Sequence, residues 1–340
     1  AFGQIETYKA EIPSSFAFNE FIIISDWAEA KVGTLTSSWE WFLPWKTIDG
    51  VNREPKTKSQ LEVVLRGMCN KKVLIDLMHY FIGFRKNDVE LTKIIAGYHQ
   101  YHAVNKAIDK TIKAIGNSKK IGVIWHSQGS GKSLSMAFYA GKLARNKEMR
   151  NPSLVVLTDR NDLDDQLFDT FCAHSQFFRE PPKKIEKQPE LKQLLKTASG
   201  GIFFTTIQKF LDKNNSKFEL LTDRENVVVI ADEAHRTQYG LKAKIKNDVL
   251  RYGFAKYLRD ALPNASFIGF TGTPIELSDK STRQVFGGNI DVYDMHAALE
   301  DHRVVPIKYE AKLIKLGKNE DVFKQLDESI DDLTEYEEQT

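Results

Sequence analysis

Residues 121–133 read IGVIWHSQGSGKS, and this stretch decides the fold. Its first part, Ile121–Trp125, is a continuous apolar run with the length of a β-strand. After Ser133, apolar side chains recur at helical spacing, at Leu134, Ala137, Phe138, Ala140, Leu143 and Ala144. A glycine-rich turn therefore joins a buried strand to an amphipathic helix, which is the arrangement of a loop that binds phosphate groups at a helix amino terminus.

Four further apolar runs follow along the chain. Each is a continuous hydrophobic stretch, as expected of a parallel strand that is covered on both faces. They are Leu154–Thr158, Gly201–Thr206, Val227–Ala231 and Phe267–Phe270. Segments with helical spacing separate most of the runs, so residues 116–300 are predicted to form a doubly wound, mostly parallel α/β domain. A ligand of such a domain binds at the carboxyl ends of the strands.

The residues before this domain have two different patterns. Residues 1–55 combine short β-like runs with four of the five tryptophans of the chain, which predicts a compact piece that contains a sheet. Residues 56–115 are predicted to be helical, with one helix over 59–83 and a second over about 91–115. Within the α/β domain, residues 181–190 are rich in proline and lysine and are predicted to be a surface connection without secondary structure.

The glycine-rich turn has the residues that a nucleoside triphosphate site requires. Its glycines allow the backbone to turn tightly enough for successive N–H groups to face one anion. Lys132 can reach the β and γ phosphates, and the Ser133 hydroxyl can bind Mg²⁺. His126 stands where the general pattern has its first glycine. The alternative is a turn that binds nothing; we interpret it as an ATP site formed by Ser127, Gln128, Gly129, Ser130, Gly131, Lys132 and Ser133.

An acidic pair follows another of the buried runs. Asp232 comes directly after Val227–Ala231, and a carboxylate there can hold the Mg²⁺ that Ser133 also binds, partly through water. Glu233 is then placed to polarise the water that attacks the γ-phosphate. Such a pair could instead cap the next helix, but its occurrence after a phosphate loop favours catalysis. The predicted catalytic residues are Lys132, Asp232 and Glu233.

A third motif, Thr271-Gly272-Thr273, follows the run Phe267–Phe270. Small hydroxyl side chains on a tight turn can hydrogen-bond to the acidic pair and respond to the presence of the γ-phosphate. Taken alone, these residues are an ordinary turn. As the third motif in the series, they are interpreted as an element that couples nucleotide binding to movement.

The composition excludes several classes of protein. With 41% hydrophobic and 28% charged residues among 340, the chain is neither disordered nor fibrous. No apolar run reaches the ~18–20 residues of a membrane span. Cys69 and Cys172 cannot form a disulfide framework, so a reducing compartment is expected. The net charge of +2 conceals an acidic stretch over residues 319–340, which leaves a moderately basic body compatible with a polyanionic partner.

The three motifs, in this order, resemble those of superfamily-two helicases and translocases, with an Asp-Glu-Ala-His box that ends at His235. The residues around these motifs resemble those of the R subunit, the restriction and motor subunit, of bacterial type I restriction enzymes. Residues 125–133, 157–167 (LTDRNDLDDQL) and 232–240 (DEAHRTQYG) carry this resemblance. A histidine at position 126 is expected in that family. The resemblance covers nearly the whole chain and implies a RecA-like motor domain, with His235 in the coupling machinery.

The resemblance implies further site residues. Gln100, in the stretch YHQYHAV ahead of the phosphate loop, is expected to read adenine, although it could be a polar residue on a helix face. Gln4 and Tyr8 match the Gln-x-x-x-Tyr motif that closes the nuclease domain of the family, and their spacing places them on one helical face. Contacts to the backbone of double-stranded DNA, which suit movement over any sequence, are expected from Thr158, Arg160, Thr205, Thr206 and Gln208; helix capping is the alternative.

The resemblance also divides the chain. Residues 1–55 are expected to be the C-terminal part of the nuclease domain, 56–115 a helical linker with the adenine segment, 116–300 the first RecA-like motor domain, and 301–340 the crossover into a second motor domain. The second lobe and the nuclease metal site are expected outside this chain.

One short segment imitates a nuclease core. Glu29-Ala30-Lys31, with Asp26 nearby, has the residue types of a metal-dependent nuclease. It is interpreted as a decoy, because the residues after it are expected to break away rather than to continue a strand.

The leading hypothesis is an ATP-dependent double-stranded DNA translocase and endonuclease subunit of a type I restriction enzyme. Its cofactors are ATP and Mg²⁺, its partners DNA and the methyltransferase and specificity subunits, and its location the bacterial cytoplasm, with no membrane contact. By itself the chain is expected to hydrolyse ATP weakly or not at all, because an arginine finger from the second lobe would contribute a factor of ~10³–10⁵. The recognised DNA sequence, the step size, the direction of movement and the stoichiometry are not encoded in these motifs.

Two alternatives remain open at this point. The chain could belong to a superfamily-two helicase or remodeller with no restriction role, which the sequence preceding Ala1 would decide. It could also be a nucleotide-binding scaffold that does not hydrolyse ATP. The intact Lys132, Ser133, Asp232 and Glu233 argue against the scaffold.

Overall fold

The computed structural model describes residues 1–86, 91–158, 161–197, 199–206, 220–234, 244–246, 249–251, 254–273 and 280–305. The chain divides into two units, Ala1–Val304 and Val305–Thr340, and every element below belongs to the first. Within the described residues, no helix is long and apolar enough to cross a membrane.

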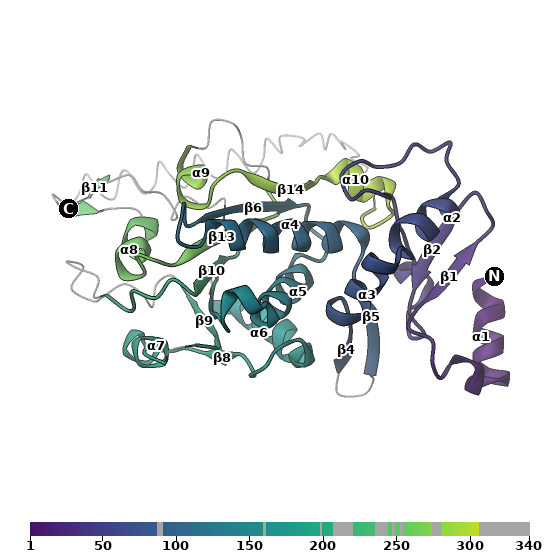
Figure 1. Cartoon of the computed structure of the whole chain (residues 1–340), viewed down its shortest axis with the longest axis horizontal. Coiled ribbons are helices and arrows are strands. Elements are labelled where there is room, and N and C mark those ends of the chain that lie inside the picture. Colours follow the sequence, from purple (N-terminus) through teal and green to yellow (C-terminus); the bar gives the residue numbers. More distant parts are fainter. Residues whose placement is uncertain are drawn as a thin grey trace, which may run out of the picture. The chain divides into compact units, whose positions relative to one another are not determined.

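Seven parallel strands form the central sheet (Figure 1), in the order β14-β6-β13-β10-β7-β9-β8. Their side chains are mostly apolar without polar alternation, because helices cover both faces. The predicted α/β fold, with a parallel sheet like that of a RecA-like lobe, is therefore confirmed. The strands are β6 (Lys120–His126), β7 (Ser153–Thr158), β8 (Lys183–Lys184), β9 (Ile202–Thr206), β10 (Val227–Ala231), β13 (Ser266–Thr271) and β14 (Asn289–Tyr293).

Successive side chains of the inner strands β7, β10 and β13 pack into different cores. In β10, Val228 and Ile230 belong to one core, whereas Val227 and Val229 belong to the other. This alternation follows from the two-residue period of a strand. The first core packs against α4 (Tyr98–Ala114), α5 (Lys132–Arg145) and α6 (Asn161–Ala173); the second packs against α7 (Gln188–Leu195), α8 (Phe254–Ala261) and α9 (Lys280–Phe286).

All five predicted strands are present, to within one residue at each end. The edge strand β14 was not predicted, because its polar Asn289 and Asp291 break the apolar run. The prediction that residues 181–190 lack secondary structure is wrong. Lys183 and Lys184 pair with β9 as the other edge strand, where charged side chains stay solvated, and α7 begins at Gln188.

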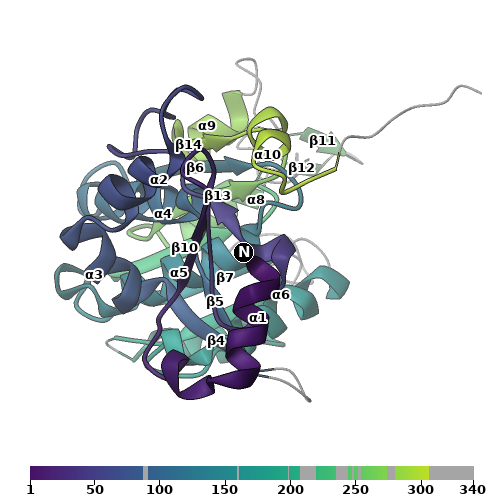
Figure 2. The same ribbon diagram turned by 90° about the vertical axis from the view of Figure 1, so that its right-hand side faces the viewer.

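A small antiparallel sheet precedes the central one, as predicted for the first residues of the chain. Its strands are β1 (Ile22–Ser25), β2 (Ala30–Gly33) and β3 (Leu43–Pro44), in that order. The N-terminal helix α1 (Phe2–Glu11), which faces the viewer in Figure 2, lies beside β1 in Figure 1 and contacts the residues before β3 through the ring of Phe2, whose centroid lies 5.8 Å from that of Trp39 and 5.5 Å from that of Phe42.

The segment between the two sheets is only partly helical. It contains α2 (Gln60–Val63), a π-helical turn (Val64–Met68), α3 (Lys71–Tyr80) and a hairpin of β4 (Ile82–Lys86) and β5 (Leu91–Ile95). The helix predicted over residues 91–115 is wrong in its first part, because the β-branched residues of β5 favour a strand and α4 begins only at Tyr98. The helix predicted over 59–83 is also interrupted, since Asn70 caps a new helix by accepting a hydrogen bond from the N–H of Lys72 (3.1 Å).

The remaining elements are short. The helix α10 (Met295–Glu300) follows β14, and β11 (Lys244–Lys246) pairs antiparallel with β12 (Val249–Arg251). Single 3-10 turns cover Pro13–Phe16, Trp39–Trp41, Lys147–Met149 and Ser175–Phe177.

A partly buried ion pair connects the segment before the central sheet to a helix that covers the sheet. The ammonium group of Lys142, on α5, lies 2.6 Å from Asp76 Oδ1 on α3. It also donates to Asn105 Oδ1 on α4, at 2.6 Å. Three helices are therefore joined at one polar point inside an otherwise apolar contact.

Candidate nucleotide-binding site

The three motifs lie at the carboxyl edge of the central sheet. β13 lies between β6 and β10, and the parallel register pairs Thr271 with Trp125 and Gly269 with Ala231. The phosphate loop after β6 and Asp232 after β10 are therefore on the same edge, separated by one strand. Since neighbouring strands lie ~4.8 Å apart, β6 and β10 are about 10 Å apart. Both groups can face a single bound nucleotide.

Two glycines give the phosphate loop its shape. Gly129 and Gly131 have φ angles of 83° and 84°, in the left-handed region that residues with a Cβ rarely adopt. A Cβ on Gly131 would also lie 2.8 Å from Gln100 Nε2. Inside the turn, the buried Ser130 hydroxyl donates to the Ser127 carbonyl at 2.6 Å. Consecutive N–H groups in a turn of this kind form a concave site for an anion.

The ammonium group of Lys132 lies beside the Thr-Gly-Thr motif. A Cβ on Gly272 would lie only 2.8 Å from Lys132 Nζ. The motif itself is a closed turn, in which the N–H of Thr273 donates to Thr271 Oγ1 at 3.1 Å. A Cβ at position 272 would displace this ammonium group, which is the mobile end of a long side chain. The structure thus places the first and third motifs side by side.

Hydrogen bonds to both neighbouring strands fix the acidic turn. The N–H of Asp232 donates to the Leu157 carbonyl at 3.0 Å, and that of Ala234 donates to the Phe270 carbonyl at 2.9 Å. Glu233 has a φ of 49°, which is uncommon for a residue other than glycine. Both carboxylates are partly exposed at the edge. A backbone strained in this way, and held by its surroundings, is often found at functional sites.

Two buried side chains of α4 hold the phosphate loop. Gln100 donates from Nε2 to the Gly131 carbonyl (3.0 Å) and accepts from the N–H of Gly97 (2.9 Å). His99 Nε2 lies 3.0 Å from the Ser130 carbonyl, which can only accept, so this nitrogen carries a proton. Burial lowers the pKa of His99 well below its ordinary value, and the ring is neutral. The sequence did not predict this role of His99, and the reading of adenine by Gln100 stays a prediction.

His126, which replaces the first glycine of the general pattern, is anchored to β14. Its Nε2 donates to Asp291 Oδ2 at 3.1 Å, and Lys106 donates to the other oxygen at 2.7 Å. Burial alone would raise the pKa of Asp291, but the hydrogen bonds and charges of His126 and Lys106 hold it below its ordinary value. The histidine therefore fixes the point at which the loop leaves the sheet.

A second buried carboxylate joins distant parts of the chain. Asp301, 3% exposed, accepts hydrogen bonds from the hydroxyls of Tyr98 (2.7 Å) and Tyr293 (2.8 Å) and from the Arg53 guanidinium (2.7 Å). The Tyr293 ring stacks on His99, with centroids 4.1 Å apart. The cluster therefore reaches the side chain that holds the phosphate loop. No motif signals it, because its members are scattered along the sequence.

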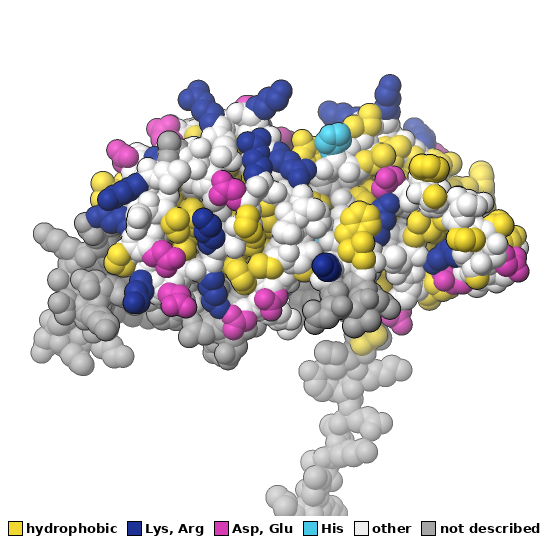
Figure 3. Space-filling model, turned by 90° about the horizontal axis from the view of Figure 1, so that it is seen from below, with side chains coloured by type: hydrophobic (Ala, Val, Ile, Leu, Met, Phe, Trp, Pro, Cys, Tyr) yellow, Lys and Arg dark blue, Asp and Glu magenta, His cyan; other side chains and the backbone are white. Residues whose placement is uncertain are grey.

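The predicted DNA contacts lie partly within the described residues. Thr158 ends β7 and is paired with Thr206, which ends β9 next to Thr205. All three side chains are about 1% exposed. On the face seen in Figure 3, Lys and Arg side chains are interspersed with Asp and Glu. DNA contact stays a prediction, and Arg160, Gln208 and His235 lie outside the described residues.

At the start of the chain, Gln4 and Tyr8 share an exposed face of α1. Gln4 Nε2 donates to Tyr8 Oη at 2.7 Å. The prediction that spacing alone places the two side chains together is confirmed. Their role in a nuclease stays a prediction.

The segment that imitates a nuclease core has structural contacts instead. Asp26 Oδ1 accepts from the N–H of Glu29 at 2.8 Å, and the Lys31 ammonium lies 4.4 Å from the centre of the Trp39 ring. The expectation that no strand continues here is wrong, because β2 runs from Ala30 to Gly33. Across the described part of the chain, no group of three or more His, Cys, Asp or Glu could hold a metal ion.

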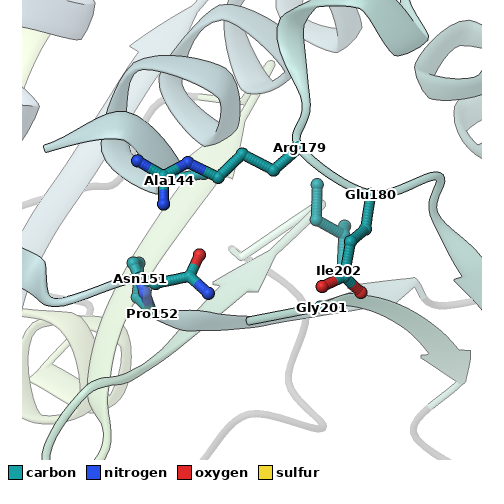
Figure 4. Close-up of a pocket in the computed structure, with 7 residues that line it drawn as sticks. All are labelled: Ala144, Asn151, Pro152, Arg179, Glu180, Gly201 and Ile202. Carbon is teal, nitrogen blue, oxygen red and sulfur yellow. The ribbon is translucent and has the colours of Figure 1, made fainter. Parts of the chain in front are cut away.

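A separate hollow lies at the opposite edge of the sheet. It is lined by the residues that precede β7 and β9, including Asn151 and Gly201, and by Arg179 and Glu180 (Figure 4). Since it opens at the amino ends of the strands, it is not part of the site around Lys132.

A parallel sheet with a phosphate loop, and an acidic turn one strand away, define a P-loop ATPase domain of RecA-like architecture. The chain matches the SWI2/SNF2 ATPase family over residues 99–340, and it belongs to that family. The ATPase domain implies that the bound nucleotide is ATP.

Relatives connect the chain to restriction enzymes. It is 47% identical to the type I restriction enzyme HindI endonuclease subunit of Haemophilus influenzae, over 98% of this chain and 32% of that protein. It is 39% identical to a candidate type I restriction enzyme endonuclease subunit, MjaIXP, of Methanocaldococcus jannaschii, over 96% of this chain and 32% of that protein. These relatives confirm the resemblance to R subunits. The chain spans about a third of the length of the curated relatives it matches.

A solved structure gives a weaker likeness. A fragment of a candidate HsdR subunit of a type I restriction enzyme from Vibrio vulnificus YJ016 is 18% identical, with a TM-score of 0.39, and the match covers 88% of this chain and 45% of that one. The assignment of the fold rests on the strand order described above.

The residues at the carboxyl edge fit ATP and Mg²⁺. The loop N–H groups and the Lys132 ammonium are donors for phosphate oxygens, and the left-handed φ angles of Gly129 and Gly131 allow the tight turn that brings those N–H groups together. The Ser133 hydroxyl and the Asp232 carboxylate are the hard oxygen ligands that Mg²⁺ prefers.

Proposed function

We propose that this chain forms the first motor lobe of an ATP-dependent double-stranded DNA translocase, the R subunit of a type I restriction enzyme. The observation that supports this most directly is the common edge on which the phosphate loop, the acidic turn and the Thr-Gly-Thr motif meet. The 47% identity to a restriction endonuclease subunit favours a restriction role over a helicase or remodeller of another kind. The intact Glu233 favours hydrolysis over a passive scaffold.

In the proposed reaction, the loop N–H groups and Lys132 bind the β and γ phosphates. Mg²⁺ would be held by Ser133 and Asp232, partly through water, and would neutralise charge on the phosphates. Glu233 orients the attacking water and accepts its proton. Thr271 and Thr273, beside the Lys132 ammonium, respond to the presence of the γ-phosphate.

The domain assignment follows from the same proposal. Residues 1–55 belong to the nuclease domain, 56–115 form the linker with the adenine segment, 116–300 form the first lobe, and 301–340 lead to the second. The DNA backbone is held where β7 and β9 end, at Thr158, Thr205 and Thr206, whose burial leaves the direct contacts to the Arg160 and Gln208 that follow them in the sequence, and His235 takes part in coupling. Methyltransferase and specificity subunits complete the enzyme, and Gln4 and Tyr8 serve the nuclease.

Replacing Lys132 tests the proposal. In the 340-residue chain, Lys132→Ala should weaken ADP binding at least ~10-fold in calorimetric titration, since a hydrogen bond to a charged group contributes ~1.5–3 kcal/mol. In the full-length subunit assembled with its partners, it should abolish DNA-stimulated ATP hydrolysis. Lys147→Ala, at an exposed position after the same helix, is the matched control. Normal ADP binding and normal hydrolysis by Lys132→Ala would show that the motor assignment is wrong.

A further inference from the structure

The segment after α10 lies along the phosphate loop. Arg303 Nη2 lies 3.6 Å from the position that a Cβ on Gly131 would take, and Val304 Cγ1 lies 3.2 Å from the corresponding position on Gly129. Two consecutive residues of this segment therefore approach the two glycines that shape the loop. Of these two residues, Arg303 brings a positive charge close to the loop.

Arg303 has no anionic partner among the described residues. Its Nε is buried without a hydrogen-bond partner there, and no described carboxylate lies within ion-pairing distance of its guanidinium group. Asp301 and Arg303 line one small pocket next to α4, but Asp301 already accepts hydrogen bonds from Arg53, Tyr98 and Tyr293. The charge of Asp301 therefore acts on Arg303 without a direct ion pair between the two groups.

On the side away from the phosphate loop, the guanidinium group of Arg303 is held by an aromatic ring. Its Cζ lies 5.2 Å from the centre of the Trp41 ring, in the range of a cation–π contact. The backbone N–H of Arg303 donates to the Ala298 carbonyl at 2.9 Å, which closes the end of α10. Burial lowers the pKa of Arg303, but an arginine side chain keeps its proton. A charged group is thus held in place next to the loop.

A partly buried charge without a partner lowers the stability of the folded protein, because it has lost contact with water, and a bound anion would offset this loss. The loop beside Arg303 is built to bind the anionic part of a nucleotide. Lys132 approaches that loop from the side of β13, through Gly272, whereas Arg303 approaches from the side of α4, next to Gln100. The two cations therefore flank the loop from different directions.

We propose that Arg303 binds a phosphate oxygen of the nucleotide and is a second cationic residue of the site, supplied by the same chain. This inference rests on the proposed function, because it needs a nucleotide in the loop. A bound nucleotide would then hold residues 303–304 against the loop by a charge-assisted hydrogen bond.

The test compares Arg303→Met with the wild type in the 340-residue chain. Methionine keeps an unbranched side chain but removes the charge. ADP is titrated calorimetrically at about 0.05 M and about 0.5 M salt, a range over which charge screening changes strongly. At low salt, Arg303→Met should bind ADP about tenfold more weakly or worse, the factor expected for a lost charge-assisted hydrogen bond. The loss should shrink at high salt, and Arg303→Lys should recover part of the affinity.

Two controls separate binding from folding. Arg66→Met removes the same charge from an exposed arginine that pairs with Glu62 at 2.7 Å, and it should bind ADP normally. The temperature of thermal unfolding without nucleotide should be unchanged or slightly raised in Arg303→Met, because the loss of the contact with Trp41 is offset by removal of a partly buried charge. The stabilisation that ADP adds should fall in the variant.

Several outcomes overturn the inference. Equal ADP binding by Arg303→Met and the wild type does so, and so does a loss with unchanged salt dependence, which would indicate contact with the base or sugar. If Lys132→Ala loses ADP and Arg303→Met does not, only this inference fails and the proposed function stands. If the wild-type chain itself does not bind ADP, both fail.

Discussion

The carboxyl edge of the sheet and the cluster around Asp301 are assembled in different ways. At the edge, each functional side chain belongs to a short continuous stretch that follows a strand, so local backbone geometry positions it. In the cluster, Arg53, Tyr98, Tyr293 and Asp301 meet only after the chain has folded. The edge is therefore suited to chemistry and the cluster to holding parts together. Mutations in the two regions should affect different measurements.

The largest effect is expected at the edge. Glu233→Gln should lower DNA-stimulated ATP hydrolysis by the full-length subunit by ~10²–10⁴-fold, because the variant loses the base that accepts the proton of the water. ADP binding and the free energy of unfolding of the chain should hardly change. Glu225→Gln, in the exposed segment before the opposite end of β10, is the matched control. Hydrolysis at the wild-type rate would remove Glu233 from the mechanism.

In the cluster, the expected effect is on stability. Asp301→Ala should lower the free energy of unfolding by ~3–5 kcal/mol, because it leaves two buried hydroxyls without their acceptor and Arg53 with only its longer ion pair to Glu300 at 3.4 Å. Denaturant unfolding measures this change. The adjacent Glu300→Ala removes the same charge from a more exposed pair with Lys56 and should cost less than ~1 kcal/mol. Equal losses in the two variants would contradict the structural role of the cluster.

A smaller effect should appear as a pH dependence. Burial, and then the charge of Lys106, lower the pKa of His102 from 6.5 to about 4. The folded chain therefore binds this proton more weakly than the unfolded chain. Its stability should be complete above pH 6.5 and should fall by at most ~3 kcal/mol as the pH falls towards 4.

Variants assign this pH dependence to the residue. His102→Gln should flatten the fall in unfolding free energy between pH 6.5 and 4, although His99, whose pKa is also lowered, should leave part of it. His296→Gln, at a residue with an 82% exposed side chain, should keep the wild-type profile. A profile unchanged in His102→Gln would mean that another group causes the fall.

The sequence predicted the central strands and the edge because both depend on local patterns. Burial on two faces requires a continuous apolar run such as Val227–Ala231, and the phosphate loop needs glycine at fixed positions. The two edge strands escaped prediction because one of their faces is solvated. In β14, polar residues therefore interrupt the run, and β8 consists of two lysines.

The contacts between distant segments could not be predicted for a different reason. Helical spacing allowed Leu91–Ile95 to be taken as part of α4, whereas its pairing with β4 makes it a strand. The contact of His99 with Ser130, and that of Asp301 with Arg53, depend on how whole elements pack. The residues next to His99 and Asp301 in the sequence contain no pattern that indicates Ser130 or Arg53 as a partner.

The helix α5 carries the phosphate loop at its first turn and, ten residues later, the ammonium group that Asp76 and Asn105 grip. At 1.5 Å per residue, about 15 Å of rigid rod separate these two points. If α5 moves when the nucleotide binds or leaves, then either α3 and α4 move with it or the ion pair between Asp76 and Lys142 breaks. In the proposed motor, movement of α5 at the nucleotide would therefore be passed to α3 and α4.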